Sequence, residues 1–223
     1  MFQALFYKEW VKTRRIIILI GAIFAGIIIY SFINTGQTFR IGGSVQAWAD
    51  IILKDAPVFP SIIQWLPLLT ALLLAFAQFV PEMTNKRLKL SLHLPMPETK
   101  IISTMLCYGL VILVIIYLIT YIILITGLSF YYPQEIRILA FWKSLPWFIA
   151  GLTGYLLATW ICLEPVWRQR IYNAFISICI LALFFIRAQS GAYLPLLYVL
   201  AIIVIIGFGL PFYSATRFKE GKQ

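Results

Sequence analysis

The stretch Pro81–Lys100, PEMTNKRLKLSLHLPMPETK, separates two strongly apolar parts of the chain and carries six charged side chains and three prolines. A charged side chain at the centre of a bilayer costs about 2.5–3.5 kcal/mol on insertion scales. This stretch is therefore expected to lie in water, as the connection between two membrane-spanning helices. Its position decides how the apolar runs on either side divide into spans.

The rest of the chain is too apolar for a water-soluble protein. Of its 223 residues, 62% are hydrophobic and 12% are charged, and the mean hydropathy is +0.93. We predict an all-α polytopic membrane protein that forms a single transmembrane domain, residues 1–223, because repeated apolar runs leave no room for a sizeable soluble domain. Membrane topology explains the net charge of +10 better than nucleic-acid binding does, so no nucleic-acid partner is expected.

Six apolar runs are long enough to cross a bilayer as helices. The first would be about 27 Å long at about 1.5 Å per residue, against about 30 Å for the hydrocarbon layer. The polar, glycine-bearing segment 34–59 is expected to be a loop with a turn or two of surface helix. Residues 128–143 are expected to be a connection in the headgroup region. The predicted spans are 16–33, 60–80, 101–127, 144–163, 171–186 and 194–213.

The segment before the first span, residues 2–15, has apolar residues at helical spacing among its charges. This pattern is typical of an amphipathic helix that lies in the membrane interface. Six spans then place both termini, the stretch 82–100 and the turn 164–170 on one side of the membrane. Of the 18 Lys and Arg residues, 13 lie on that side, because only five lie on the other, namely Arg40, Lys54, Arg137, Lys143 and Arg187. The positive-inside rule therefore predicts cytoplasmic termini, in the cytoplasmic (inner) membrane of a prokaryote.

Small residues recur at four-residue spacing in three of the spans. This spacing allows a second helix to approach closely. The candidate helix-packing residues are Gly21, Ala22, Ala25 and Gly26 in the first span, Ala71 and Ala75 in the second, and Ala150, Gly154 and Ala158 in the fourth.

The chain lacks the residue sets of common catalytic and nucleotide-binding sites. It has a single histidine, His93, which excludes histidine-dependent triads and metal clusters, and it has no GxxxxGK[ST] motif. We therefore expect no catalytic residue, metal ligand or cofactor site in this chain. The predicted spans carry no ionisable residue near their centres, which argues against an ion-driven carrier. Energy for any uphill transport would have to come from another subunit.

Three features occur together: an amphipathic start that leads into the first span, six spans, and a patterned loop after the second span. The loop begins with an acid, Glu82, continues through a short amphipathic segment, Met83–Leu90, and an L-x-x-P segment, Leu92–Pro95, and ends at Lys100. In these features the chain resembles the membrane subunit of an ABC exporter of the ABC-2 type. The resemblance implies that the loop 82–100 contains a coupling helix, which docks on a separate ATPase subunit that binds ATP and Mg²⁺.

The resemblance also implies roles for individual residues. The starting helix would be a connector along the membrane, with Lys8, Glu9 and Lys12 in it. The ATPase would be contacted by Glu82, Asn85, Lys86, Arg87 and Lys89. The chain would work as a permease subunit in a homodimer or heterodimer, surrounded by membrane lipids. The predominance of aromatic and aliphatic faces favours export of an amphiphilic or lipid-like substrate over a strongly charged one. It departs from the family in its basic MTNKRLK segment, where members often have an acidic-glycine-threonine pattern, and in the short connection 187–193 between the last two spans.

Other interpretations of the same residues remain open. The basic residues of 86–89 would also suit anionic lipid headgroups. The chain could be a membrane anchor or assembly subunit that does not transport, since such a protein would have the same spans. A membrane-embedded enzyme would need a polar cluster at the membrane boundary, and Glu164, Arg168 and Arg170 are the only local candidates. Pro165 at a helix start with flanking charges is the simpler explanation of these three.

Overall fold

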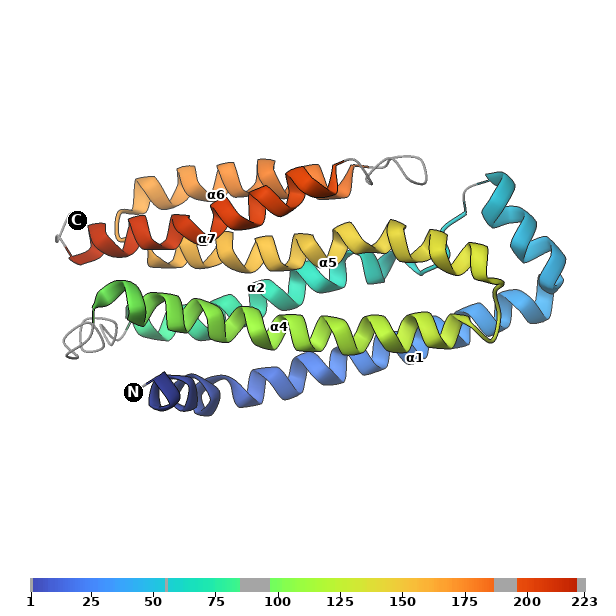
Figure 1. Cartoon of the computed structure of the whole chain (residues 1–223), viewed down its shortest axis with the longest axis horizontal. Coiled ribbons are helices and arrows are strands. Elements are labelled where there is room, and N and C mark those ends of the chain that lie inside the picture. Colours follow the sequence, from blue (N-terminus) through green and yellow to red (C-terminus); the bar gives the residue numbers. More distant parts are fainter. Residues whose placement is uncertain (1, 55, 85–96, 187–195, 220–223) are drawn as a thin grey trace.

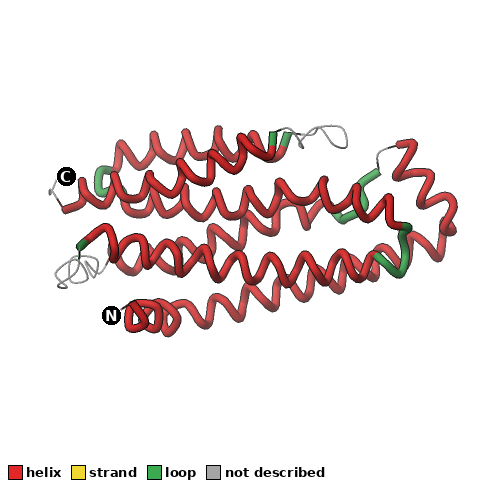
Figure 2. Tube along the Cα trace, in the orientation of Figure 1, coloured by secondary structure: helices red, strands yellow, loops and turns green. Residues whose placement is uncertain are grey.

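In the computed structural model the chain forms a bundle of long helices (Figures 1 and 2). The structure describes residues 2–54, 56–84, 97–186 and 196–219, and no strand occurs among them. The helices are α1 (Phe2–Lys54), α2 (Ser61–Thr84), α4 (Glu98–Leu128), α5 (Gln134–Leu163), α6 (Trp167–Ala182), the 3-10 helix η1 (Leu183–Phe185) and α7 (Leu197–Lys219).

Within the described residues, six helical stretches are long and apolar enough to cross a membrane. They confirm the all-α class and the prediction of six helices that are long and apolar enough to span a membrane, and they indicate a multi-pass membrane protein. Large apolar side chains point outward from the edge helices, among them Ile18 of α1, Ile119 of α4 and Ile205 of α7, each more than half exposed. Such faces suit hydrocarbon, where a helix satisfies its own backbone hydrogen bonds.

The first and last described residues lie at the same end of the bundle, which we call the terminal end (Figure 1). The end of α2, the start of α4 and the α5–α6 connection also lie there. The opposite, distal end holds the last turns of α1 and the α4–α5 connection. The core lies between α2, α4 and α5, where Leu74, Phe79, Met105 and Tyr155 are almost fully buried.

The distal end corrects the prediction of a loop over 34–59. Helix α1 runs to Lys54, and its direction changes at Gly43, whose φ of 74° is a conformation that favours glycine. Beyond this kink Ile51 is buried against residues of α4 and α5. The Trp48 indole Nε1 donates a hydrogen bond of 3.2 Å to the carbonyl of Tyr131. The polar composition therefore belongs to a helix that packs on one face, not to a loop.

The connection between α4 and α5 is also shorter than the predicted 128–143. Helix α5 begins at Gln134, directly after Pro133, whose extended backbone precedes the first helical turn. Proline at this place is compatible with a helix start because the first turn needs no backbone N–H donor from it. Residues 134–143 of the predicted connection therefore belong to helix α5.

Candidate functional site at the terminal end

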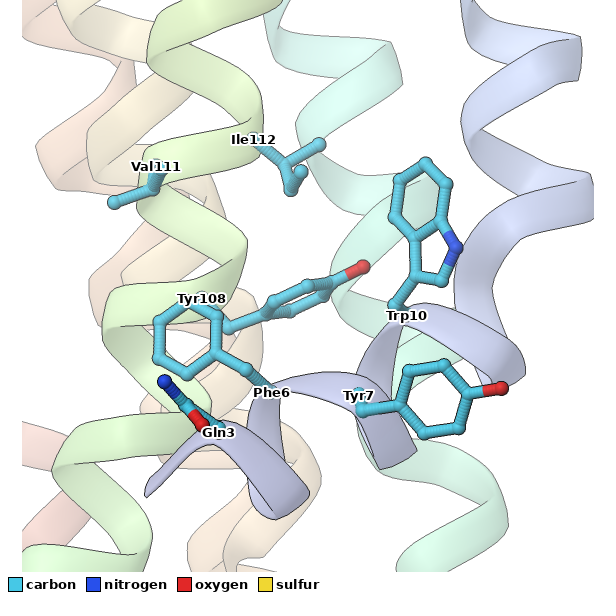
Figure 3. A pocket seen from close by; sticks show the side chains of 7 residues that line it. All are labelled: Gln3, Phe6, Tyr7, Trp10, Tyr108, Val111 and Ile112. Carbon is cyan, nitrogen blue, oxygen red and sulfur yellow. The ribbon is translucent and has the colours of Figure 1, made fainter. Parts of the chain in front are cut away.

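The first turns of α1 run across the long axis of the bundle before the helix turns along it (Figures 1 and 3). Leu5, Glu9 and Thr13, which are spaced by four residues, form the buried face of this segment. Tyr7 and Trp10 are exposed on another face. The segment thus turns a partly polar face toward the bundle and aromatic rings away from it.

Four side chains of α1 and α2 meet beneath this segment, and we call them the ionic cluster: Lys8, Glu9, Lys12 and Glu82. Lys12 Nζ lies 2.9 Å from Glu82 Oε1 and 2.8 Å from Glu9 Oε2. Lys8 Nζ lies 3.1 Å from the same Glu82 oxygen. Both carboxylates are 1% exposed, so their charges depend on these lysines for compensation.

The two carboxyl groups of the ionic cluster differ in how firmly they hold their charge. Burial raises the pKa of Glu9, against the opposing attraction of Lys12 and Lys8. Burial acts in the same direction on Glu82, but the hydrogen bond and attraction of Lys12, together with Lys8, outweigh it and hold the pKa of that carboxyl below its usual range. Both residues lie outside the predicted spans 16–33 and 60–80. As pH falls, Glu9 is therefore the first of the two to take up a proton.

Two polar residues extend the ionic cluster into the bundle. The hydroxyl oxygens of Thr13 and of Tyr108 on α4 are 2.7 Å apart. Gln78, one turn before Glu82, donates to the carbonyl of Met105 at 2.9 Å and accepts from the Tyr155 hydroxyl at 2.7 Å. The last turns of α2 are thus bonded to α1, α4 and α5. In the sequence, the only indication of this role is that Gln78 is a lone amide in an apolar run, four residues before the acid Glu82.

A third buried glutamate joins the ends of α5, α6 and α7, and we call its group the Glu164 clamp: Glu164, Arg170, Ser214 and Arg217. Glu164 is fully buried, its Oε2 accepts a hydrogen bond of 2.6 Å from Ser214, and its Oε1 lies 3.1 Å from Arg217 Nη1. Arg170 donates to the Glu164 carbonyl oxygen at 2.7 Å. A buried ion pair, which the sequence did not reveal, therefore replaces the explanation of Glu164 as a flanking charge of Pro165. Arg168 is exposed.

The predicted docking residues are placed only in part. Asn85, Lys86, Arg87 and Lys89 lie outside the described residues. Glu82 is buried and bonded to α1, so it joins two helices and does not lie on a surface that a partner could contact. The predicted connector residues Lys8, Glu9 and Lys12 all contact this one carboxylate or each other.

The small-residue positions fall into two groups. An added Cβ at Gly154 would lie 2.4 Å from Leu68 Cδ1, so α5 and α2 approach closely there. An added Cβ at Gly21 or Gly26 would meet nothing within 4 Å. Positions in α2 and α5 are buried, namely Ala71, Ala75, Ala150, Gly154 and Ala158, whereas those in α1 are exposed, namely Gly21, Ala22, Ala25 and Gly26.

No protein-family model, curated protein or solved structure matches the chain. In the part of the chain that the structure describes, no group of three His, Cys, Asp or Glu side chains could hold a metal ion. The ionic cluster instead joins helix ends through paired charges. Such an arrangement can transmit a displacement from one helix end to its neighbours.

Proposed function

We propose that the chain is the permease subunit of an ATP-driven ABC transporter and exports an amphiphilic or lipid-like substrate. The observation that supports this most is the ionic cluster, in which Lys8 and Lys12 of the connector segment bind Glu82, the first residue of the coupling loop. A separate ATPase subunit, which binds ATP and Mg²⁺, would dock on the loop that follows Glu82. The terminal end would then face the cytoplasm, as the basic residues predict.

The contacts give the proposed coupling a physical route. Movement of the docked loop would displace the last turn of α2, to which Glu82 belongs. Lys8 and Lys12 would carry that displacement to the start of α1, and Gln78 would carry it to α4 and α5. Breaking a buried ion pair costs about 3–5 kcal/mol. A displacement of one helix end would therefore move its partner with it and would not separate the two. Glu82 is thus a positioning residue, and Asn85, Lys86, Arg87 and Lys89 would form the contact with the ATPase.

A second permease copy, identical or similar, would complete the translocation path between the two chains. The exposed small residues of α1, from Gly21 to Gly26, offer a face on which another helix can pack closely. Outward faces made of aliphatic and aromatic side chains suit an amphiphilic substrate better than a strongly charged one.

The direct test is co-purification with a soluble protein that contains GxxxxGK[ST] and is encoded by an adjacent gene. We expect the triple charge reversal of Lys86, Arg87 and Lys89 to Glu to abolish ATPase binding. The matched control reverses Arg168, Lys219 and Lys222, which carry the same total charge and lie on the same predicted side. Equal binding by both variants would refute docking through the loop. If wild type recovers no ATPase at all, the chain is instead a membrane anchor or assembly subunit.

The proposed orientation has its own test. An epitope tag inserted between Lys54 and Pro60, at the distal end, should react with an antibody that is added to spheroplasts, in which the cytoplasmic membrane is intact and the outer layers have been removed. Labelling only after the membrane is opened would place the distal end in the cytoplasm and would overturn the proposed side of the termini.

A further inference from the structure

An apolar groove of about 540 Å³ lies between the start of α1 and the side of α4 (Figure 3). Figure 3 shows the first turns of α1 running across the view, with the neighbouring α4 beside them. Gln3 supplies the only amide of the lining. The rest of the lining consists of three side chains from each helix, namely Phe6, Tyr7 and Trp10 of α1 and Tyr108, Val111 and Ile112 of α4.

The groove continues into an exposed apolar stripe along α4. Val111, Ile115, Leu118 and Ile122 follow one another at spacings of three and four residues, so they lie on one face of the helix. Their exposed fractions are 47%, 48%, 55% and 61%. Because α4 is long and apolar enough to cross a membrane, this stripe would contact hydrocarbon. A lipid acyl chain could therefore follow the stripe into the groove without leaving apolar surroundings.

The α1 side of the groove has the chemistry of a headgroup boundary. Tyr7 and Trp10 belong to the residue types that favour the interface between hydrocarbon and headgroups. Arg14 lies on the same helical face, four residues after Trp10, and both Arg14 and Arg15 are exposed. A guanidinium group binds phosphate oxygens in a bidentate geometry, so the charge beside the groove complements an anionic headgroup.

We propose that this groove binds one acyl chain of an anionic phospholipid from the surrounding membrane, with the headgroup phosphate at Arg14. The chain would pack on Tyr108, whose ring contacts Phe6 edge to face at a centroid distance of 5.5 Å and whose hydroxyl bonds Thr13. The lipid thus holds the start of α1 against α4, next to the ionic cluster. The proposal depends on α4 crossing a membrane and does not depend on ATPase docking.

The test measures lipid retention by native mass spectrometry of purified protein that was exchanged into phosphatidylglycerol or into phosphatidylcholine with the same acyl chains. Wild type should retain one phosphatidylglycerol molecule through detergent washing and no corresponding phosphatidylcholine. Val111→Trp fills the groove and should lower this retention about tenfold, the change expected from losing about two buried methylenes. The matched control is Ile205→Trp on α7, an exposed position that lies in neither the groove nor the stripe, and this variant should retain the lipid. Arg14→Gln should remove the preference for phosphatidylglycerol.

A second measurement uses the wild-type protein and so does not depend on the folding of Val111→Trp. The fluorescence of Trp10 is obtained as the difference between wild type and Trp10→Phe in vesicles with brominated acyl chains. Brominated phosphatidylglycerol should quench this difference more strongly than brominated phosphatidylcholine. Equal quenching by the two lipids, or equal retention by wild type and a folded Val111→Trp variant, would overturn the proposal.

Discussion

Helices α1 and α5 have similar sequence features but differ in how they pack against the rest of the bundle. A buried glutamate lies near the terminal end of each, Glu9 within α1 and Glu164 directly after α5, and a run of small residues lies further along. In their most apolar 18-residue windows, 72% of α5 is buried but only 22% of α1. Helix α5 is therefore buried over most of its surface, whereas α1 packs along one face, through Ile20, Phe24 and Ile28, and leaves the rest of its surface exposed. We infer that the ionic cluster is an adjustable contact, at which the ends of α1 and α2 can shift relative to each other, and that the Glu164 clamp is a fixed contact.

The chemistry of the two groups agrees with this difference. In the Glu164 clamp, Arg217 and the Ser214 hydroxyl bind the Glu164 carboxylate, and Arg170 donates to the backbone carbonyl of the same residue. In the ionic cluster, Lys8 and Lys12 both bind one oxygen of Glu82, and Lys8 is 39% exposed. Lysine is a flexible point charge, and arginine is a planar group with a fixed fork of donors. The lysines can follow a shift of α2 that the clamp would resist.

The largest effect on stability is expected for Glu164→Gln. This change leaves Arg217, which is 20% exposed, without its carboxylate. The free energy of unfolding should fall by about 3 kcal/mol, as for the loss of one partner of a buried ion pair. Thermal unfolding in detergent measures this loss. Glu135→Gln, an exposed position in the first turn of α5, is the control and should change stability little. Equal losses for the two variants would show that the clamp does not fix α5.

A smaller loss, about 2 kcal/mol, is expected for Lys12→Met, because hydrogen bonds to charged groups contribute about 1.5–3 kcal/mol. Lys8 still compensates Glu82, and Glu9 can take up a proton. Without Lys12, burial raises the pKa of Glu9 with less opposition. A carboxyl group whose folded-state pKa is raised stabilises the fold below its unfolded pKa and loses that contribution as pH rises through the folded value.

The Lys12→Met loss should therefore be larger at about pH 8 than at about pH 5. Unfolding of wild type and variant in detergent at both pH values measures the difference. A loss that is independent of pH, or that grows as pH falls, would contradict protonation of Glu9 as the compensating event.

Predictability from sequence differed between these two helices. The six spans were predictable because a long apolar run identifies a membrane helix without knowledge of its neighbours. The helix after Gly43 was not, because its buried side chain Ile51 belongs to an apolar cluster with residues of other helices, and the polar local sequence does not reveal that packing. In the same way, Ser214 and Arg217 have no sequence signal that pairs them with Glu164. The contact between Lys12 and Glu82 joins residues far apart in the chain, and the family resemblance assigned them to two separate elements, the connector and the docking loop.

The small-residue runs give a third prediction. Gly154→Ala forces the buried Leu68 to move, at a cost of about 1–3 kcal/mol, of which the better helix propensity of alanine returns about 1 kcal/mol. A net loss of about 1 kcal/mol is therefore expected. Gly21→Ala meets no neighbouring atom and should be neutral or stabilising by up to about 1 kcal/mol. Thermal unfolding of both variants compares them, and a larger loss at Gly21 would reverse the assignment of close packing to α5.

The smallest single effect is expected for Lys8→Met, within about 0.5 kcal/mol, because an exposed lysine contributes little to an ion pair while Lys12 remains on Glu82. The double variant Lys8→Met, Lys12→Met is more informative. It leaves Glu82 buried without the two lysines that compensate it, so its loss should exceed the sum of the two single losses by about 1 kcal/mol. Unfolding of all four proteins measures this coupling. Simple additivity would mean that each lysine stabilises the fold independently, and the ionic cluster would then lack the shared carboxylate that makes it adjustable.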